Sequence, residues 1–192
     1  MGGRVGGAVN LGAAVPTIGP MDELIILNFD GGSRGNPGIA GTGVVLRAAD
    51  GTPLITMGRY IGRATNNVAE YMALIDAFRQ AKKLGAKKLL VRGDSELIIK
   101  QMRGEYRVKN EGLKDLYAQA TQLADEFESV RYEHNLRERN SLADRLANLA
   151  MDRRTDVSDA DELSPRAPKP PAAGNVVCPN CGCEFHPEGK SS

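Results

Sequence analysis

Four acidic residues stand where predicted strands end or predicted helices begin: Asp30, Glu70, Asp94 and Asp144. Two of them follow the apolar runs 24–29 and 87–93, which are typical of buried strands, and α/β sheets bind their ligands at the carboxyl ends of strands. The other two lie near the starts of helices that would pack on such a sheet. If the first and the fourth strand are neighbours, all four acids converge.

Carboxylates so close together stay ionised only when cations bind among them. Their hard oxygen donors suit Mg²⁺ or Mn²⁺. Two such ions about 4 Å apart can activate a water and stabilise the leaving oxygen in phosphodiester hydrolysis. The joint placement of the four acids therefore predicts a site for two divalent cations.

Each acid also has an ordinary structural explanation. Asp30 begins an Asp-Gly turn signal, and Asn67 with Glu70 three residues later has the form of a capping box. Asp94 stands at an N-cap position, and Asp144 lies where a negative charge suits a helix dipole. Only their combination favours a metal site.

Two polar segments flank these acids. The glycine-rich segment 30–38 (DGGSRGNPG) is expected to be a loop whose backbone approaches a ligand closely. Thr65, Asn66 and Asn67 precede a predicted helix, where N–H groups and small polar side chains can hold a phosphate. Helix capping is the alternative explanation for the two asparagines.

The elements that would position these residues follow from hydrophobic periodicity. Strands are predicted at 24–29, 41–47, 53–60, 87–93 and 129–135, and helices at 66–84, 95–102, 111–127 and 141–154. Three successive short strands predict an antiparallel meander, and the later strands enter the sheet through helical crossovers. The sequence thus predicts an α/β fold with a five-stranded mixed sheet flanked by helices.

Composition limits how the chain can act. Its 192 residues carry 25 Lys and Arg against 24 Asp and Glu, a formal net charge of +1, which excludes nucleic-acid binding by bulk positive charge. The absence of Trp and an aromatic content of 5% leave little material for a base-stacking platform. The sequence contains no run of about 18 apolar residues, so no membrane-spanning helix is predicted. The three cysteines cluster within 178–183, so we expect a reducing, cytoplasmic location.

Four segments are expected along the chain. Residues 1–20 are predicted to be a disordered leader, with Met21 as an alternative start, and residues 21–153 form the main domain. Residues 154–175, acidic and then proline-rich, are predicted to be a linker. Residues 176–192 form a cysteine-rich tail.

The tail carries four candidate zinc ligands: Cys178, Cys181, Cys183 and His186. They could form one tetrahedral Zn²⁺ site. Half a site completed by a second chain, which would couple zinc to dimerisation, and a tail with free thiols are the alternatives. A closed site would aid docking and would not be catalytic.

Four stretches of the main domain resemble the ribonuclease H type I family: FDGGSRGNPGIAGTGVVL (29–46), TNNVAEYMAL (65–74), VRGDSELIIKQM (91–102) and RERNSLADRLANLAMD (137–152). The resemblance covers about residues 22–153. It implies the family's five-stranded mixed sheet and cleavage of the RNA strand of RNA–DNA hybrids with two Mg²⁺ or Mn²⁺ ions, leaving a 5′-phosphate and a 3′-hydroxyl. An enzyme that requires a 2′-hydroxyl reads sugar and groove shape, so cleavage would be largely independent of sequence.

The resemblance also assigns residues. It implies that the catalytic metal ligands are the same four acids, Asp30, Glu70, Asp94 and Asp144. The positions that would hold the two nucleic-acid backbones are Asn36, Thr65, Asn66, Asn67, Ser95 and Asn140.

The chain departs from some family members in two places. His134, ten residues before Asp144, either matches their mobile-loop histidine or ends a strand that enters a shortened loop, where Arg137 or Glu138 would then lie. Residues 102–116 lack the long basic, Trp-containing protrusion of some members. We therefore expect modest hybrid affinity that falls steeply with salt.

Three functions are compatible with this fold. A metal-dependent endoribonuclease acting on hybrids retains all four acids, whereas a non-catalytic hybrid- or RNA-binding module would be free to lose one. Another nuclease on the same fold, such as a junction resolvase or transposase core, would lack the glycine-rich and TNN segments. We expect a monomer, with dimerisation through the tail left open.

Overall fold

A mixed β-sheet forms the centre of the first part of the chain. The computed structural model describes residues 24–135, 140–158, 176–177 and 184–185. The chain divides into two units, Met1–Asp159 and Ala160–Ser192. In the second unit, β7 (Val176–Val177) pairs antiparallel with β8 (Glu184–Phe185). No helix in the described ranges is long and apolar enough to cross a membrane.

The sheet of the first unit has the strand order β5-β4-β1-β2-β3-β6. Its strands are β1 (Leu24–Gly35), β2 (Gly38–Ala48), β3 (Pro53–Ala64), β4 (Lys88–Gly93), β5 (Ser129–His134) and β6 (Val157–Ser158). The helices are α1 (Asn66–Lys83), α2 (Glu96–Met102), α3 (Glu111–Ala124) and α4 (Ser141–Arg153). β1, β2 and β3 form an antiparallel meander, while β4 is parallel to β1 and β5 parallel to β4, which confirms the predicted α/β topology.

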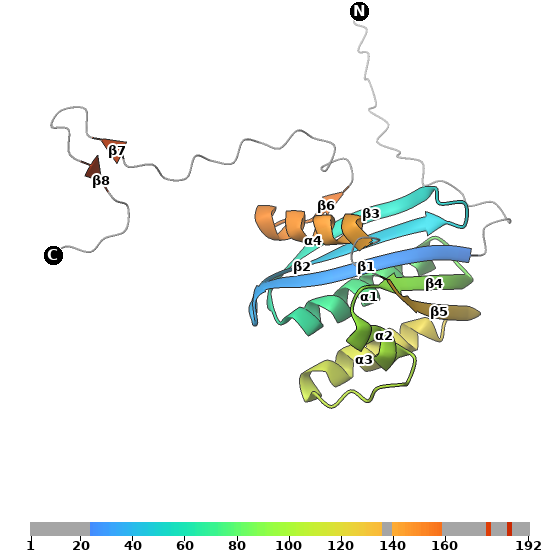
Figure 1. Ribbon diagram of the computed structural model, residues 1–192. Helices are drawn as coiled ribbons and strands as arrows, with labels where there is room; N and C mark the ends of the chain where they lie inside the picture. The colour runs from blue at the N-terminus through green and yellow to red at the C-terminus, as the bar shows by residue number, and fades with distance from the viewer. Residues whose placement is uncertain (1–23, 136–139, 159–175, 178–183, 186–192) are drawn as a thin grey trace, which may run out of the picture. The chain divides into compact units, whose positions relative to one another are not determined.

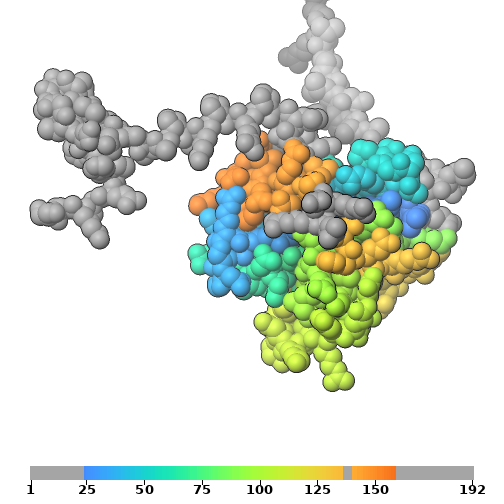
Figure 2. Space-filling view, in the orientation of Figure 1, coloured from blue at the N-terminus to red at the C-terminus, as the bar shows by residue number. Residues whose placement is uncertain are grey.

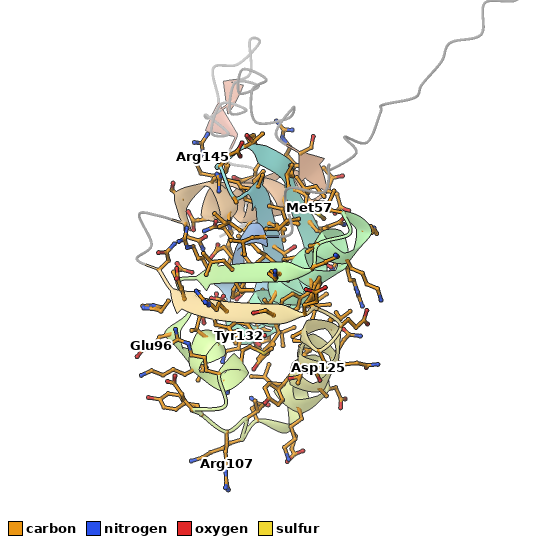
Figure 3. All side chains as sticks on the ribbon, turned by 90° about the vertical axis from the view of Figure 1, so that its right-hand side faces the viewer. Met57, Glu96, Arg107, Asp125, Tyr132 and Arg145 are labelled. Atoms are coloured by element: carbon orange, nitrogen blue, oxygen red, sulfur yellow. The ribbon has the colours of Figure 1, made fainter. Side chains whose placement is uncertain are left out.

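Helices cover the two faces of the sheet unequally (Figure 1). α4 lies on one face, above β1, β2 and β3, while α1 lies on the other face with α2 and α3 beyond it. The main core fills the α1 side, where Phe29, Tyr71 and Phe78 are fully buried. The side chain of Tyr132 on β5 lies on the side of the strand that faces α2 and α3 (Figure 3). Burial raises the pKa of this phenol.

The sheet has one strand more than the five predicted. β6 pairs with β3 through Gly58 opposite Val157, inside the segment predicted to be a linker. Val157 is buried against Leu146 and Val45 in the core beneath α4. A single valine among acidic residues has no periodicity, so only its tertiary contacts identify the strand.

The hairpin between β1 and β2 is longer than the sequence predicted. The glycine-rich segment 30–38 was expected to be a loop, but β1 continues to Gly35 and β2 begins at Gly38. Asp30 therefore lies inside β1, opposite Gly43, and not at the end of the strand. Glycine was interpreted as a turn signal, whereas all four glycines of this segment belong to paired strands.

Glycines on the sheet let two helices lie directly against its backbone. A Cβ atom on Gly31 would lie 2.2 Å from the carbonyl carbon of Ala69 in α1. A Cβ atom on Gly43 would lie 1.9 Å from the carbonyl oxygen of Ala143 in α4. Real Cβ atoms do not approach a backbone so closely, so these two residues set the distance between helix and sheet.

A buried ion pair lies beneath the meander. Asp76 of α1 is 5% exposed and its carboxylate is 2.9 Å from Nη2 of Arg59 on β3 and 3.9 Å from Nη1 of Arg79. Burial raises the pKa of Asp76 above its ordinary value of 3.8, although the two arginines act in the opposite direction.

We predict that Gly43→Ala lowers the melting temperature. The new Cβ would collide with the Ala143 carbonyl and push α4 away from the sheet, which should cost about 1–3 kcal/mol of unfolding free energy. Thermal denaturation measures the loss. Gly32→Ala is the matched control, because its Cβ would lie 3.6 Å from Met151 Cε, an ordinary contact. Equal melting temperatures for the two variants would contradict the packing argument.

We predict that Asp76→Asn changes how stability depends on pH. Because the pKa of Asp76 is raised in the folded chain, its favourable contribution is complete below pH 3.8 and is lost as pH rises through the higher folded value. Asparagine does not titrate, so the unfolding free energy of the variant should rise relative to wild type over that interval. Urea unfolding of both proteins between pH 3.5 and 7 measures it, and a constant difference would refute the assignment.

Candidate metal centre

Three carboxylates from distant parts of the sequence meet at the sheet. One oxygen each from Asp30, Glu70 and Asp94 lies within 4.8 Å of the other two. Asp30 is on β1, Glu70 on α1, and Asp94 follows the last residue of β4. β1 pairs in parallel with β4 as far as Asn28 opposite Arg92, so Asp30 and Asp94, each two residues further along, lie close together, as the convergence of the acids required. Asp30 and Glu70 are 8% and 6% exposed, so their positions are fixed by packing.

The start of α1 explains how Glu70 reaches the cluster. The N-cap of α1 is Thr65, whose hydroxyl accepts a hydrogen bond from the Val68 N–H at 3.4 Å. The predicted capping box at Asn67 is therefore wrong, and Glu70 lies in the second turn. Gly31 has no side chain to separate β1 from this turn, since a Cβ there would lie 2.3 Å from the Glu70 nitrogen. The glycine thus brings Glu70 against the strand that carries Asp30.

Asp144 borders the same cavity from α4. The cavity has a volume of about 310 Å³ and is lined by Asp30, Gly31, Gly32, Ser33, Arg34, Asn66, Glu70, Asp94, Asp144, Ala147, Asn148 and Met151. Asp144 is in the first turn of its helix, where its backbone carbonyl accepts a hydrogen bond from Asn148 Nδ2 at 2.9 Å. The structure therefore places all four predicted acids on one cavity, three of them in direct proximity.

Asn140 connects the strands to the acidic cluster from inside the protein. It is 1% exposed, and its Nδ2 donates to the Phe29 carbonyl at 2.8 Å and to Asp94 Oδ1 at 3.4 Å. Its Oδ1 accepts from Asn28 Nδ2 at 3.3 Å. The sequence predicted a substrate contact for Asn140, but the structure turns this amide inward, where it orients Asp94. Asp94 itself precedes the N-cap of α2, which is Ser95, and is not the cap.

Only some of the residues predicted to hold the nucleic-acid backbones lie at the border of the cavity. Asn36 Oδ1 accepts a hydrogen bond from the backbone N–H of Asn66 at 3.3 Å, which ties the hairpin to the start of α1. Asn66 is exposed and lines the cavity, while Asn67 is half-buried. Ser95 is half-buried at the start of α2, where its side chain makes no capping bond.

His134 is the last residue of β5, as the strand alternative predicted. It is exposed, with Nε2 at 3.1 Å from the backbone oxygen of Asp94. Arg137 and Glu138, the alternative residues for this region, lie outside the described residues. The four candidate zinc ligands, Cys178, Cys181, Cys183 and His186, also lie outside them, so the zinc site remains a prediction.

Sequence reasoning did not select three further residues that line the cavity. Arg34 was included only as part of the glycine-rich segment, and its position becomes apparent once β1 extends beyond Asp30. Asn148 stands four residues after Asp144, a helical spacing that could have identified it. Met151 contributes an apolar surface at the end of α4.

The donor set suits hard divalent cations. Carboxylate oxygens are the ligands that Mg²⁺ and Mn²⁺ prefer. The three-acid cluster offers one such oxygen from each residue, and the three oxygens lie within 4.8 Å of one another, close enough to bind the same ion. Asp144 adds a fourth carboxylate across the cavity. Of the described lining residues only Arg34 is cationic, so the acids leave the cavity strongly negative unless cations bind.

We predict that Asn140→Ala weakens divalent-cation binding. Asp94 would lose its amide donor, and residues that orient metal ligands typically contribute about 10-fold or more to metal affinity. The Phe29 carbonyl would also lose a buried donor, so stability should fall by about 1–3 kcal/mol. Calorimetric Mn²⁺ titration and thermal denaturation measure the two effects.

Asn148→Ala is the control for this prediction. Its amide donates to a carbonyl of its own helix and, among the described residues, to no carboxylate of the cluster, so metal affinity should change much less. Unchanged Mn²⁺ affinity in a folded Asn140→Ala variant would show that Asp94 keeps its orientation without the amide.

Known proteins share both the sequence and the fold of this part of the chain. The family model described as reverse transcriptase-like matches residues 28–150, well over half of the chain. The bifunctional protein Rv2228c of Mycobacterium tuberculosis is 49% identical over 138 residues, which cover 71% of this chain. The match spans only 38% of the length of that mycobacterial protein.

Two further relatives carry ribonuclease names. Ribonuclease HI of Halobacterium salinarum is 44% identical over 124 residues, covering 65% of this chain and 62% of the relative. The crystal structure of LC11-RNase H1 in complex with an RNA/DNA hybrid superposes with a TM-score of 0.65 at 43% identity. It covers 68% of this chain and 98% of that one.

Proposed function

The chain belongs to the reverse transcriptase-like family of ribonuclease H-like domains, and we propose that it hydrolyses the RNA strand of RNA–DNA hybrids. The observation that carries the proposal is the cluster of Asp30, Glu70 and Asp94, with Asp144 across the same cavity. The similarity to a ribonuclease H1 crystallised with a hybrid supports the choice of substrate. A non-catalytic binding module would have no need to keep four carboxylates in this arrangement.

The four acids would hold two divalent cations, with Mg²⁺ or Mn²⁺ as the natural choice. When bound, such ions supply a water nucleophile at neutral pH and neutralise charge on the scissile phosphate. The chain's own contribution is to fix the ligands before the substrate arrives. Asp30 and Glu70 are fixed by burial, and Asp94 by the amide of Asn140. Water attack would leave a 5′-phosphate and a 3′-hydroxyl.

The border formed by the hairpin and the start of α1 would hold the backbones of the hybrid. Asn36, Thr65, Asn66 and Asn67 on this border, together with Ser95 at the start of α2, are the proposed contacts. Asn36 and Asn66 are already joined by a hydrogen bond, so the two can act as one rigid unit. Small polar groups at a helix start recognise phosphates and sugars, not base edges, which supports cleavage largely independent of sequence.

The remaining predictions concern the whole chain. The 1–20 leader, the linker near 154–175 and a Zn²⁺ site in the 176–192 tail remain proposals, as do the monomeric state and the cytoplasmic location. Zinc analysis of the purified full chain tests the tail: one Zn²⁺ per chain supports a complete site, and half as much supports one shared between two chains.

We predict that the wild-type chain cleaves an RNA–DNA hybrid in Mg²⁺ or Mn²⁺ and that Asp30→Asn loses at least about 100-fold of this activity. Asp30 would act as a metal ligand, and the ions that it helps to hold would neutralise the charge that develops in the transition state, where one such interaction is typically worth about 10²–10³ in rate. A labelled hybrid resolved on a denaturing gel measures cleavage, with duplex DNA and duplex RNA as substrates that should remain intact.

Asp115→Asn is the matched control, because Asp115 is an exposed acid on α3 outside the cavity lining. It should retain wild-type activity. If the folded wild-type protein cleaves no hybrid in either ion, the enzymatic proposal is wrong, and measurable hybrid binding in that case would favour the non-catalytic module.

A further inference from the structure

The charge balance of the cavity gives a role to Arg34, the one positively charged side chain among its described lining residues. Four carboxylates and two divalent ions carry charges that cancel, so a phosphodiester bound there adds a negative charge with no partner. Arg34 is the lining residue that can supply the missing positive charge. It lies near the end of β1, opposite Ile39, on the hairpin that also carries Asn36.

An ion pair holds Arg34 at the border of the cavity. Its Nη1 is 2.7 Å from Oδ1 of Asp152 in the last turn of α4, and the side chains are 48% and 60% exposed. Asp152 is not among the lining residues, so it binds the guanidinium from outside. Figure 2 shows the blue end of β1 and β2 directly beneath α4 in orange, the arrangement that this pair connects.

The guanidinium retains donors for a second anion. The 2.7 Å contact with Asp152 is made by Nη1, one of the three guanidinium nitrogens of Arg34. A guanidinium presents five donors in a planar fork and binds a carboxylate and a phosphate oxygen with the same geometry. An exposed ion pair is weak, so a phosphate can share Arg34 with Asp152 or displace it at little cost.

We propose that Arg34 is a substrate-positioning residue whose guanidinium binds a backbone phosphate of the hybrid beside the metal centre. This inference rests on the proposed hydrolysis of RNA–DNA hybrids and adds a specific anchor to it. In the free protein Asp152 pairs with the guanidinium, and when the hybrid binds, a substrate phosphate would compete with Asp152 for it.

A purely structural role makes a different prediction. If the Arg34–Asp152 pair only fixes the hairpin against α4, then Arg34→Gln and Asp152→Asn must have the same effect, because each breaks the pair. If Arg34 binds phosphate, only Arg34→Gln removes the charge that the substrate meets. The two variants therefore separate substrate binding from hairpin stability.

Steady-state cleavage of a labelled hybrid at several salt concentrations tests the proposal. We expect Arg34→Gln to raise KM about 10-fold with kcat within about 2-fold, because a charge-assisted contact that forms on binding is lost. The slope of log KM against log salt should fall by about 1, the value of one phosphate contact. Asp152→Asn should leave KM no higher than wild type, and Arg34→Lys should recover part of the loss.

Arg79→Gln is the control for general loss of positive charge. Arg79 is 47% exposed, close to the 48% of Arg34, and it too lies beside an aspartate, Asp76. It stands nine residues after Glu70 on α1, about 13 Å further along the helix. Its KM and salt slope should stay at the wild-type values.

Hybrid binding by inactive proteins separates this inference from the proposed function. Fluorescence anisotropy compares Asp30→Asn with the Asp30→Asn/Arg34→Gln double variant in Mg²⁺. Weaker binding and a smaller salt slope in the double variant support the phosphate contact, whether or not the wild type cleaves. Equal binding, equal KM values for Arg34→Gln and wild type, or equal losses in Arg34→Gln and Asp152→Asn overturn it. Cleavage by the wild type leaves the proposed function intact in each of those cases.

Discussion

The close approach of two helices to the sheet backbone is the constraint on which the site depends. Gly31 leaves space for the second turn of α1, and Gly43 leaves space for the first turn of α4. Those turns carry Glu70 and Asp144, so the glycines decide how far two of the acids stand from Asp30. A side chain at either glycine would move a whole helix, and with it a carboxylate. Packing and chemistry are therefore set by the same contacts.

The buried acids of this chain have two kinds of surroundings. Asp76 is paired with Arg59 and Arg79, which offset part of the cost of its burial, and it is not among the residues that line the cavity. Asp30 and Glu70 are buried to a similar extent but stand beside another carboxylate, Asp94. Like charges at this distance oppose each other, and bound divalent cations reverse the sign of that interaction. The first arrangement serves the fold, whereas the second makes the site ready for metal.

The sequence predicted the elements well because strands and helices bury different periodic patterns. It identified the four acids from their predicted places near strand ends and helix starts, although Asp30 lies inside β1 and Glu70 in the second turn of α1. It failed where a residue's role depends on a distant partner. The glycines of 30–38 indicated a loop because nothing local reveals that α1 lies against Gly31. Asn140 and Val157 have no local signal either, since Phe29, Asp94 and Leu146 are far away in sequence.

A nearly neutral chain can bind a polyanion if positive charge is concentrated at the place where the polyanion binds. Net charge averages over the whole surface, whereas a phosphate responds to charges within about 10 Å at moderate salt. Figure 3 shows Arg145 on α4 and Arg107 on the loop after α2 at opposite ends of the domain, so these two arginines do not belong to one basic patch. In the proposed function, affinity would come from the cavity, where bound cations would convert the four acids into a phosphate site. Arg34, paired with Asp152 beside them, would supply the further positive charge that a bound phosphodiester requires.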